Sequence, residues 1–234
     1  MTASHQALDS KAQKEIDRAV LCLKSGGIIT FPTDTLYGLG ADVFNEAALQ
    51  RVFAIKGRNR GLALPVLVDG WERVAMVAAE PSQMAERLAR QFWPGPLTLV
   101  LLRSPSLSDL VTGGGDTVAV RQPNHWVPQG LVAGLGHPIT GTSANLSGQR
   151  DLLTVDEIKN NLGAQVDYII DCGPAPQGTP STVVDVTDGA PKLLREGAIP
   201  FAEVVRVIGQ NNGFSGHFQD QSAPPYEGGA RGGN

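Results

Sequence analysis

The hydrophobic positions of the chain change period repeatedly, from the spacing of a helix to that of a strand. Ile16, Ala19 and Leu23 recur at intervals of three or four residues, which predicts an amphipathic helix that begins at Ser10. The apolar run that follows, residues 28–31, predicts a buried strand. The same patterns predict further helices over residues 45–55, 82–92, 128–135, 154–163 and 201–208. They predict further strands over residues 64–68, 97–102, 117–121, 139–142, 168–170, 182–186 and 192–194.

Strands that alternate with helices are typical of an α/β fold with helices layered around one sheet. The last predicted strands follow one another too closely for helical crossovers, so we expect the sheet to be mixed. We predict a single catalytic domain over residues 10–208, preceded by a flexible N-terminus at residues 1–9. Residues 209–234 are rich in Gly, Gln, Asn and Ser and poor in aliphatic residues, which predicts a disordered tail.

Composition narrows the classes of function. The net charge of -4 argues against a protein that coats nucleic acid non-specifically, because such binding needs a basic surface. The two cysteines, Cys22 and Cys172, have no metal-ligand spacing and read as buried residues of a reducing compartment. Neither a signal peptide nor an apolar run long enough for a membrane helix is visible, so we expect a cytoplasmic protein.

Polar residues collect directly after several predicted strands, where open α/β sheets bind their ligands. The loop 32–40 carries Thr33, Asp34 and Thr35, and its alternative interpretation is a turn in which Asp34 and Thr35 bond their own backbone. The segment 141–148 is dense in hydroxyl, amide and glycine residues. Its Ser143 lacks the G-x-S-x-G context of a nucleophile, so hydrogen bonding is the better interpretation.

Two further clusters contain cations. Lys56 and Arg58 lie at the expected C-terminus of a helix, where they suit either the helix dipole or a phosphate group. Residues 178–182 precede a valine-rich strand, and Arg195 follows the next one. Arg121 ends its own strand, and an ion pair with a carboxylate is its structural alternative. Neither a P-loop nor a G-x-G-x-x-G motif is present. These residues predict a polar, arginine-bearing cleft for a small anionic ligand.

Taken in order, the clusters resemble the YrdC-like family of threonylcarbamoyl-AMP synthases. The loop 32–40 resembles the family's P-T-[DE]-T-x-Y-G-L-G segment, and the 56–58 and 143–145 segments resemble its K-x-R and S-x-N signatures. The likeness extends over about residues 10 to 208 and includes four more segments: 93–98, 121–123, 181–183 and 194–197.

The resemblance implies a twisted mixed sheet with surrounding helices and a concave, basic cleft. It implies a nucleotidyltransferase that joins L-threonine, bicarbonate and ATP into threonylcarbamoyl-AMP and pyrophosphate, with Mg²⁺ on the polyphosphate. The product serves the threonylcarbamoyl modification of tRNA adenosine. The implied partners are the proteins that transfer this group to tRNA, with weak RNA binding as a further property.

The resemblance also assigns roles by position. Lys56 and Arg58 are expected to be catalytic through neutralisation of phosphate charge, and no protein metal site is expected. The threonine and bicarbonate contacts correspond to Thr35, Arg121, Ser143 and Ser181. The ATP contacts correspond to Lys56, Arg58, Thr117, Asn145 and Arg195, with Thr154 as a further candidate.

The chain departs from the family pattern at Asn59 and Ala63, where prolines are common. Because it ends at Asn234, it is expected to be the single-domain form of the family. Two alternatives stay open at this point. One is a non-catalytic, double-stranded-RNA-binding or ribosome-maturation module of the same fold. The other is a carbamoyl-transfer enzyme that acts on a different acceptor.

Overall fold

The computed structural model describes residues 10–57, 61–172 and 178–209. Its helices are α1 (Ser10–Lys24), α2 (Glu46–Lys56), the 3-10 helix η1 (Trp71–Met76), α3 (Gln83–Phe92), α4 (Asp109–Thr112), α5 (Trp126–Leu135), α6 (Val155–Leu162) and α7 (Phe201–Gly209). Its strands are β1 (Ile29–Phe31), β2 (Gly38–Gly40), β3 (Val66–Leu67), β4 (Leu97–Leu102), β5 (Thr117–Arg121), β6 (Ile139–Thr140), β7 (Thr142–Ser143), β8 (Tyr168–Ile169), β9 (Thr182–Asp185) and β10 (Lys192–Arg195).

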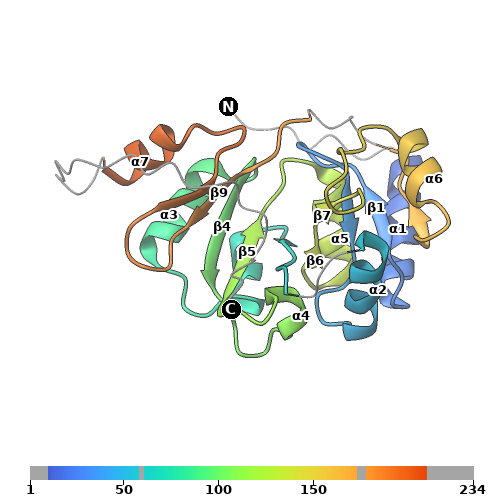
Figure 1. Cartoon of the computed structure of the whole chain (residues 1–234), viewed down its shortest axis with the longest axis horizontal. Helices are drawn as coiled ribbons and strands as arrows, with labels where there is room; N and C mark the ends of the chain where they lie inside the picture. The colour runs from blue at the N-terminus through green and yellow to red at the C-terminus, as the bar shows by residue number, and fades with distance from the viewer. Residues whose placement is uncertain (1–9, 58–60, 173–177, 210–234) are drawn as a thin grey trace.

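The strands form two mixed sheets, so the α/β class is confirmed and the prediction of one sheet is wrong. The first sheet has the order β7-β2-β1-β8, and the second has the order β10-β9-β4-β5-β3-β6. Figure 1 shows the second sheet on the left, with β4, β5 and β9, and the first sheet on the right, with β1 and β7. Each sheet combines parallel with antiparallel pairs.

The first sheet arises because the end of the predicted loop is itself a strand. β2 turns back and pairs antiparallel with β1, with Phe31 opposite Gly38. A Cβ at Gly38 would lie 2.8 Å from the Phe31 ring, and one at Gly40 would lie 2.6 Å from it. Both distances are too short for a side chain, so the two glycines let the strand pass over the aromatic ring.

The second sheet has two different faces because its side chains alternate. Leu97, Leu99 and Leu101 of β4 join the larger hydrophobic core. Thr98 lies on the opposite face, directly across from Val183 of β9. That opposite face carries a small cluster of apolar side chains, and Thr98, Ala119 and Val183 line a cavity there.

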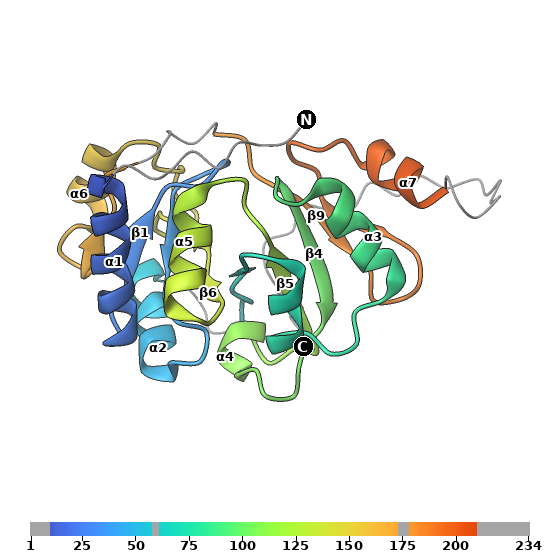
Figure 2. The same cartoon turned by 180° about the vertical axis from the view of Figure 1, so that it is seen from behind.

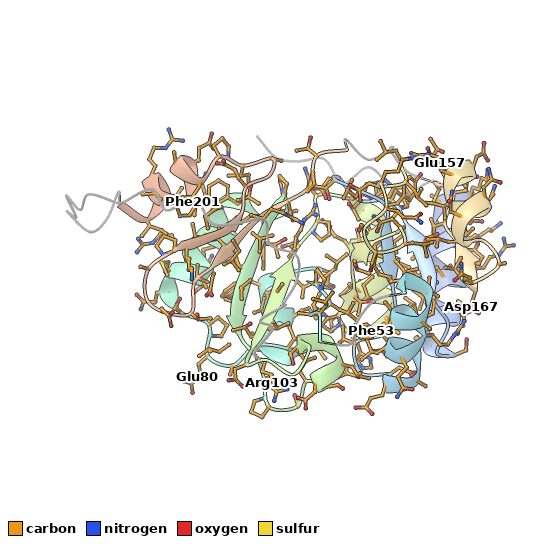
Figure 3. The ribbon with its side chains drawn as sticks, in the orientation of Figure 1. Phe53, Glu80, Arg103, Glu157, Asp167 and Phe201 are labelled. Carbon is orange, nitrogen blue, oxygen red and sulfur yellow. The ribbon has the colours of Figure 1, made fainter. Side chains whose placement is uncertain are left out.

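The helices cover the outer faces of both sheets. α1 and α5 pack side by side on the first sheet through Ala19, Leu23 and Leu131, and Figure 2 shows the two helices from the front. α3 packs against the second sheet, with α7 beside it. Figure 3 labels Phe201 in this half of the molecule and Asp167 in the other.

Local caps confirm several predicted helix ends and correct one. Thr154 and Glu157 form the predicted capping box at the start of α6. α5 begins at Trp126 and not at Pro128, because the ring nitrogen Nδ1 of His125 accepts from the Val127 amide and caps the helix earlier. η1 and α4 were not predicted.

The predicted N-terminal segment, most of the predicted tail and Arg58 lie outside the described residues, and the domain boundaries stay predictions. Within the described ranges no helix is long and apolar enough to cross a membrane.

Candidate functional site

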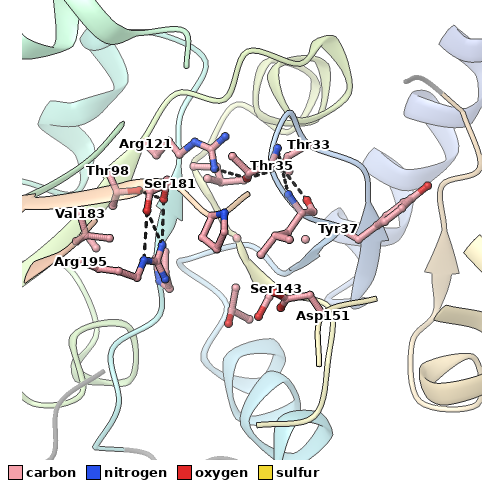
Figure 4. Close-up of a pocket in the computed structure, with 18 of the residues that line it drawn as sticks. Thr33, Thr35, Tyr37, Thr98, Arg121, Ser143, Asp151, Ser181, Val183 and Arg195 are labelled. Atoms are coloured by element: carbon pink, nitrogen blue, oxygen red, sulfur yellow. Dashed lines mark hydrogen bonds between the residues drawn. The ribbon is translucent and has the colours of Figure 1, made fainter. Parts of the chain in front are cut away.

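A cavity of about 230 Å³ lies where the two sheets meet (Figure 4). Sheet residues and the loops that follow strands contribute to its wall. The side chains and backbone that line it belong to Thr33, Thr35, Leu36, Tyr37, Gly38, Ala63, Pro65, Leu67, Thr98, Ala119, Arg121, Gly141, Thr142, Ser143, Asp151, Pro180, Ser181, Val183 and Arg195. The lining therefore combines an apolar part with hydroxyls, two guanidinium groups and one carboxylate.

The loop between β1 and β2 contributes two threonines. The Thr33 hydroxyl accepts from the amides of Thr35 and Leu36, at 3.1 and 3.2 Å, and donates to the Leu36 carbonyl at 2.6 Å. These bonds fix a tight turn and hold Thr35 at the cavity. The turn of the alternative interpretation exists, but Thr33 supplies its side-chain bonds to the backbone, whereas Asp34 and Thr35 bond Arg121 and Thr35 lines the cavity.

Arg121, at the end of β5, is held from three directions. Its Nε donates to the Gly95 carbonyl at 3.0 Å, one terminal nitrogen donates to the Thr35 hydroxyl at 2.7 Å, and the other pairs with the Asp34 carboxylate. Burial lowers the pKa of the guanidinium, the Asp34 charge opposes that shift, and the nearby Arg195 charge adds to it. The predicted structural ion pair exists, and the same arginine lines the cavity.

A second hydrogen-bonded group consists of Thr98, Ser181 and Arg195. The hydroxyls of Thr98 and Ser181 are 2.8 Å apart. Arg195 donates from two of its nitrogens to the Ser181 carbonyl, at 2.9 and 3.2 Å, and from one of them to the Ser181 hydroxyl at 3.2 Å. Its guanidinium therefore has a fixed orientation beside the cavity, as Figure 4 shows.

Lys56 lies behind the loop that follows β7. Its side chain is buried, with 3% of the residue exposed. The ammonium group donates to the Ser143 carbonyl at 2.7 Å and to both the backbone and the side-chain oxygen of Asn145 at 2.9 Å. The K-x-R and S-x-N segments are thus in direct contact through Lys56.

The structure brings together most of the site residues that the sequence predicted. Those that line the cavity are Thr35, Arg121, Ser143, Ser181 and Arg195. Asn145 and Lys56 lie directly behind Ser143, outside the lining. Thr117 is at the far end of β5 from Arg121 and does not line the cavity. The Thr154 hydroxyl caps α6 by accepting from the Glu157 amide.

Sequence reasoning missed Thr98 and Asp151 as individual site residues. Thr98 belongs to the face of β4 that points away from the core. The signal in the sequence is a single hydroxyl residue within an otherwise apolar strand. Asp151 stands in an irregular segment, so no local pattern indicated that it reaches the cavity. Among the residues that the structure describes, no group of three or more His, Cys, Asp or Glu side chains is arranged to hold a metal ion.

The fold and the cavity define an α/β protein with a polar cavity where two mixed sheets meet. The chain belongs to the Sua5/YciO/YrdC family, whose sequence profile carries the description "telomere recombination" and matches residues 22–197.

Named relatives agree with this assignment. The chain is 40% identical over 188 residues to the threonylcarbamoyl-AMP synthase of Pyrococcus abyssi, and the match covers 80% of this chain and 55% of that protein. It is 39% identical over 194 residues to a putative threonylcarbamoyl-AMP synthase of Mycobacterium leprae, across 83% of this chain and 88% of the relative. The chain thus spans little more than half of the Pyrococcus protein but most of the mycobacterial one.

Solved structures show the same fold. The crystal structure of P. abyssi Sua5 complexed with L-threonine has a TM-score of 0.81 and 39% identity, over 84% of this chain and 58% of that one. The crystal structure of E. coli YciO has a TM-score of 0.74 and 29% identity, over 80% of this chain and 91% of that one. The expected YrdC-like fold is therefore confirmed.

Proposed function

We propose that this protein is an L-threonylcarbamoyladenylate synthase, a nucleotidyltransferase that uses L-threonine, bicarbonate and ATP. The observation that carries the proposal is the convergence of Thr35, Arg121, Ser143 and Ser181 on one cavity. These residues come from separate parts of the chain, and the family resemblance assigns all of them to the amino acid and bicarbonate. A relative of the same fold was solved with L-threonine bound.

The size of the cavity supports an amino acid as the enclosed ligand. At about 230 Å³ it is smaller than the roughly 300–1,000 Å³ of pockets that enclose drug-sized molecules. We infer that threonine and bicarbonate occupy the cavity and that most of the ATP lies at its mouth. Only the reacting α-phosphate would then need to approach the enclosed substrates.

The proposed reaction has two steps. The neutral amine of threonine attacks the carbon of bicarbonate, so that a C–N bond forms, water leaves and a carbamate results. A carbamate oxygen then attacks the α-phosphorus of ATP, the bond from that phosphorus to the bridging oxygen breaks, and pyrophosphate departs. Neither step needs a protein nucleophile. The protein has to bring anions together and hold them in orientation.

The charges of the cavity support this role. Arg121 and Arg195 are close enough for the charge of one to lower the pKa of the other, so an anion between them would be favoured. We assign the carboxylate and the bicarbonate to this basic side. We assign the phosphates to Arg195, Asn145 and Arg58, the last of which lies outside the described residues. The proposed contact between Thr117 and ATP rests on the family resemblance only.

We propose that Mg²⁺ enters with the polyphosphate of ATP, where it would offset the charge that develops on the departing pyrophosphate. The product would pass to the proteins that transfer the threonylcarbamoyl group to tRNA in the cytoplasm, with weak RNA binding assisting the encounter.

The test is pyrophosphate release, with mass detection of the adenylate, on supply of ATP, Mg²⁺, bicarbonate and L-threonine. Each component is then omitted in turn. Product that requires ATP, bicarbonate and L-threonine together is the expected result. A folded protein that binds ATP and threonine but forms no adenylate would contradict the proposed activity. Double-stranded-RNA binding with a steep salt dependence, in the absence of turnover, would favour the non-catalytic module instead.

A further inference from the structure

Two groups in the cavity wall that can accept hydrogen bonds lie side by side. Ser143 and Asp151 both line it, and Figure 4 shows them next to each other, away from Arg121 and Ser181. Both side chains contact the same amide group behind them, that of Asn145. Ser143 Oγ lies 2.8 Å from Asn145 Oδ1, and Asp151 Oδ1 lies 3.4 Å from Asn145 Nδ2.

The orientation of the Asn145 amide is fixed by its other neighbours. The Lys56 ammonium lies 2.9 Å from one end of the amide. Because an ammonium group can only donate, that end must be the oxygen. The Gln149 carbonyl lies 2.7 Å from the other end. Because a carbonyl can only accept, that end must be the NH₂ group. A flipped amide would place two donors together and two acceptors together.

This orientation decides the direction of the Ser143 hydrogen bond. Asn145 Oδ1 carries no proton, so the Ser143 hydroxyl has to donate its only proton to it. The remaining lone pairs of Ser143 Oγ then face the cavity as acceptors. Asp151 accepts a hydrogen bond from Asn145 Nδ2 on one carboxylate oxygen. An ionised carboxylate has no proton to donate, so Asp151 also presents acceptors only.

The opposite side of the cavity has the reverse polarity. Arg121 donates to the Thr35 hydroxyl, and the proton of the adjacent Thr33 hydroxyl is committed to the Leu36 carbonyl. The Thr35 hydroxyl therefore donates its proton to Thr33 Oγ1, 3.1 Å away, and the group on this side that can only donate is the Arg121 guanidinium. Arg195, which likewise can only donate, lies on this side with Ser181. One side of the cavity thus suits an anion, and the Ser143–Asp151 side suits an N–H donor.

We propose that Ser143 and Asp151 form the subsite for the α-amino group of the amino-acid substrate, and that Lys56 is a positioning residue that sets the acceptor state of Ser143 through Asn145. This inference deepens the proposed function and rests on it. The three protons of the Lys56 ammonium already have acceptors at Ser143 and Asn145. A phosphate contact would require Lys56 to give up one of these bonds, which the positioning role does not.

The subsite also orients the nucleophile. A neutral amine has two N–H bonds, one for Ser143 Oγ and one for the Asp151 carboxylate. With both bonds engaged, its lone pair points away from these residues and toward the anion side, where bicarbonate is proposed to bind. The arrangement holds the amine in the direction of attack without a covalent step by the protein.

The test compares two ligands by calorimetry in the absence of ATP: L-threonine and (R)-3-hydroxybutyrate, which keeps the carboxylate, hydroxyl and methyl groups but lacks the amine. Ser143→Ala and Asp151→Asn are expected to weaken L-threonine binding about tenfold or more and to leave the analogue unchanged. Ser181→Ala, on the opposite side, is the matched control and should lower the affinity for both ligands by the same factor. An equal loss of affinity for both ligands in Ser143→Ala and Asp151→Asn would overturn the proposed subsite.

The role of Lys56 is tested with Lys56→Met, which keeps the length of the side chain without its donors. The preference for L-threonine over the analogue should fall about tenfold, while the affinity for ATP stays within about twofold. Loss of ATP binding with an unchanged preference would make Lys56 a phosphate contact and overturn the positioning role. If Lys56→Met does not fold, Asn145→Ala replaces it, because this variant also breaks the connection from Lys56 to Ser143. A preference equal to wild type in that variant would also overturn the role.

These binding measurements do not depend on turnover. Failure of the wild-type protein to form the adenylate, with the two-ligand preference intact, would contradict the proposed function and leave the amine subsite standing.

Discussion

Asp34 and Arg121 form a buried ion pair that joins the two sheets beside the cavity. Asp34 follows β1 of the first sheet, and Arg121 ends β5 of the second. The two side chains are 12% and 8% exposed. The pair therefore contributes to the site in two ways: it neutralises one of the buried charges and it fixes the guanidinium against Thr35 and Gly95.

Removal of the carboxylate should destabilise the protein. Asp34→Ala leaves the Arg121 charge buried without its anionic partner, which costs about 3 kcal/mol of unfolding free energy. Urea denaturation measures the loss. Glu86→Ala is the control, because Glu86 pairs with Arg90 on an exposed helix face, and its loss should stay below about 0.5 kcal/mol. Equal losses in the two variants would show that the buried pair contributes no more than a surface pair.

Gly40 should not accept a side chain. A Cβ there would lie 2.6 Å from the Phe31 ring and 2.9 Å from the Thr140 carbonyl oxygen. Gly40→Ala is therefore expected to lower the unfolding free energy by about 2 kcal/mol through overpacking. Gly115→Ala, where the nearest atom is an ordinary 3.5 Å away, should change it by no more than about 0.5 kcal/mol. A tolerated methyl group at Gly40 would mean that β2 does not pass over Phe31 as described.

Asp167 should make the stability of the first sheet depend on pH. Its carboxylate accepts from the Ile28 amide at 2.6 Å and pairs with Arg51 at 2.8 Å. Hydrogen bonding from Arg51 lowers the pKa of Asp167 below its usual value of 3.8. A lowered folded-state pKa gives stability that is complete above the unfolded-state pKa and is lost as the pH falls through the folded-state value.

The measurement is urea denaturation of wild type and Asp167→Asn at pH 7 and near pH 3. We expect the variant to be less stable by about 1 kcal/mol at pH 7, and the difference should shrink at the acidic pH. Both side chains of the pair are partly exposed, so added salt should also reduce the difference. A difference that is independent of pH would exclude the ionised carboxylate as its source.

Arg58→Ala should abolish adenylate formation in a protein that stays folded. The expected loss of rate is about a hundredfold or more, because a cation that stabilises developing phosphate charge is removed. Circular dichroism checks the fold, and Arg90→Ala, an exposed arginine on α3, is the control for the loss of a positive charge. Wild-type turnover in Arg58→Ala would remove this residue from the site.

Deletion of residues 210–234 should leave turnover within about twofold of the full chain, since the segment is predicted from its composition to contribute no packing. Steady-state kinetics and the urea midpoint of the two proteins are compared. A large fall in rate with an unchanged midpoint would assign the segment a functional role.

The sequence predicted the elements better than their assembly. Strands such as residues 97–102 carry long apolar runs, and their period indicated the secondary structure directly. β2 has no such signal, because its Gly38–Leu39–Gly40 segment has a single large side chain and its pairing depends on Phe31 across the sheet. Missing this strand concealed the first sheet. The early start of α5 depends on a cap by His125, a residue outside the usual capping types.

The sequence predicted which residues would gather at one place where the chemistry of a residue type is distinctive. Arginines and hydroxyls after strands indicated Arg121, Ser143, Ser181 and Arg195, all of which line one cavity. Single-sequence reasoning could not find that Lys56 donates to residues almost ninety positions later. The sequence shows only the position of the K-x-R motif, whereas the direction of the Lys56 side chain is set by tertiary structure.

Gly141 is the single residue between β6 of the second sheet and β7 of the first. It lines the cavity, and a Cβ on it would lie 2.4 Å from the Leu67 side chain. The chain thus passes from one sheet to the other directly at the cavity. A molecule that contacts Ser143 on one side and Ser181 on the other is a non-covalent cross-link between the sheets at their junction. Binding should therefore slow amide hydrogen exchange in both sheets together, and the two halves of the molecule would open as one cooperative unit.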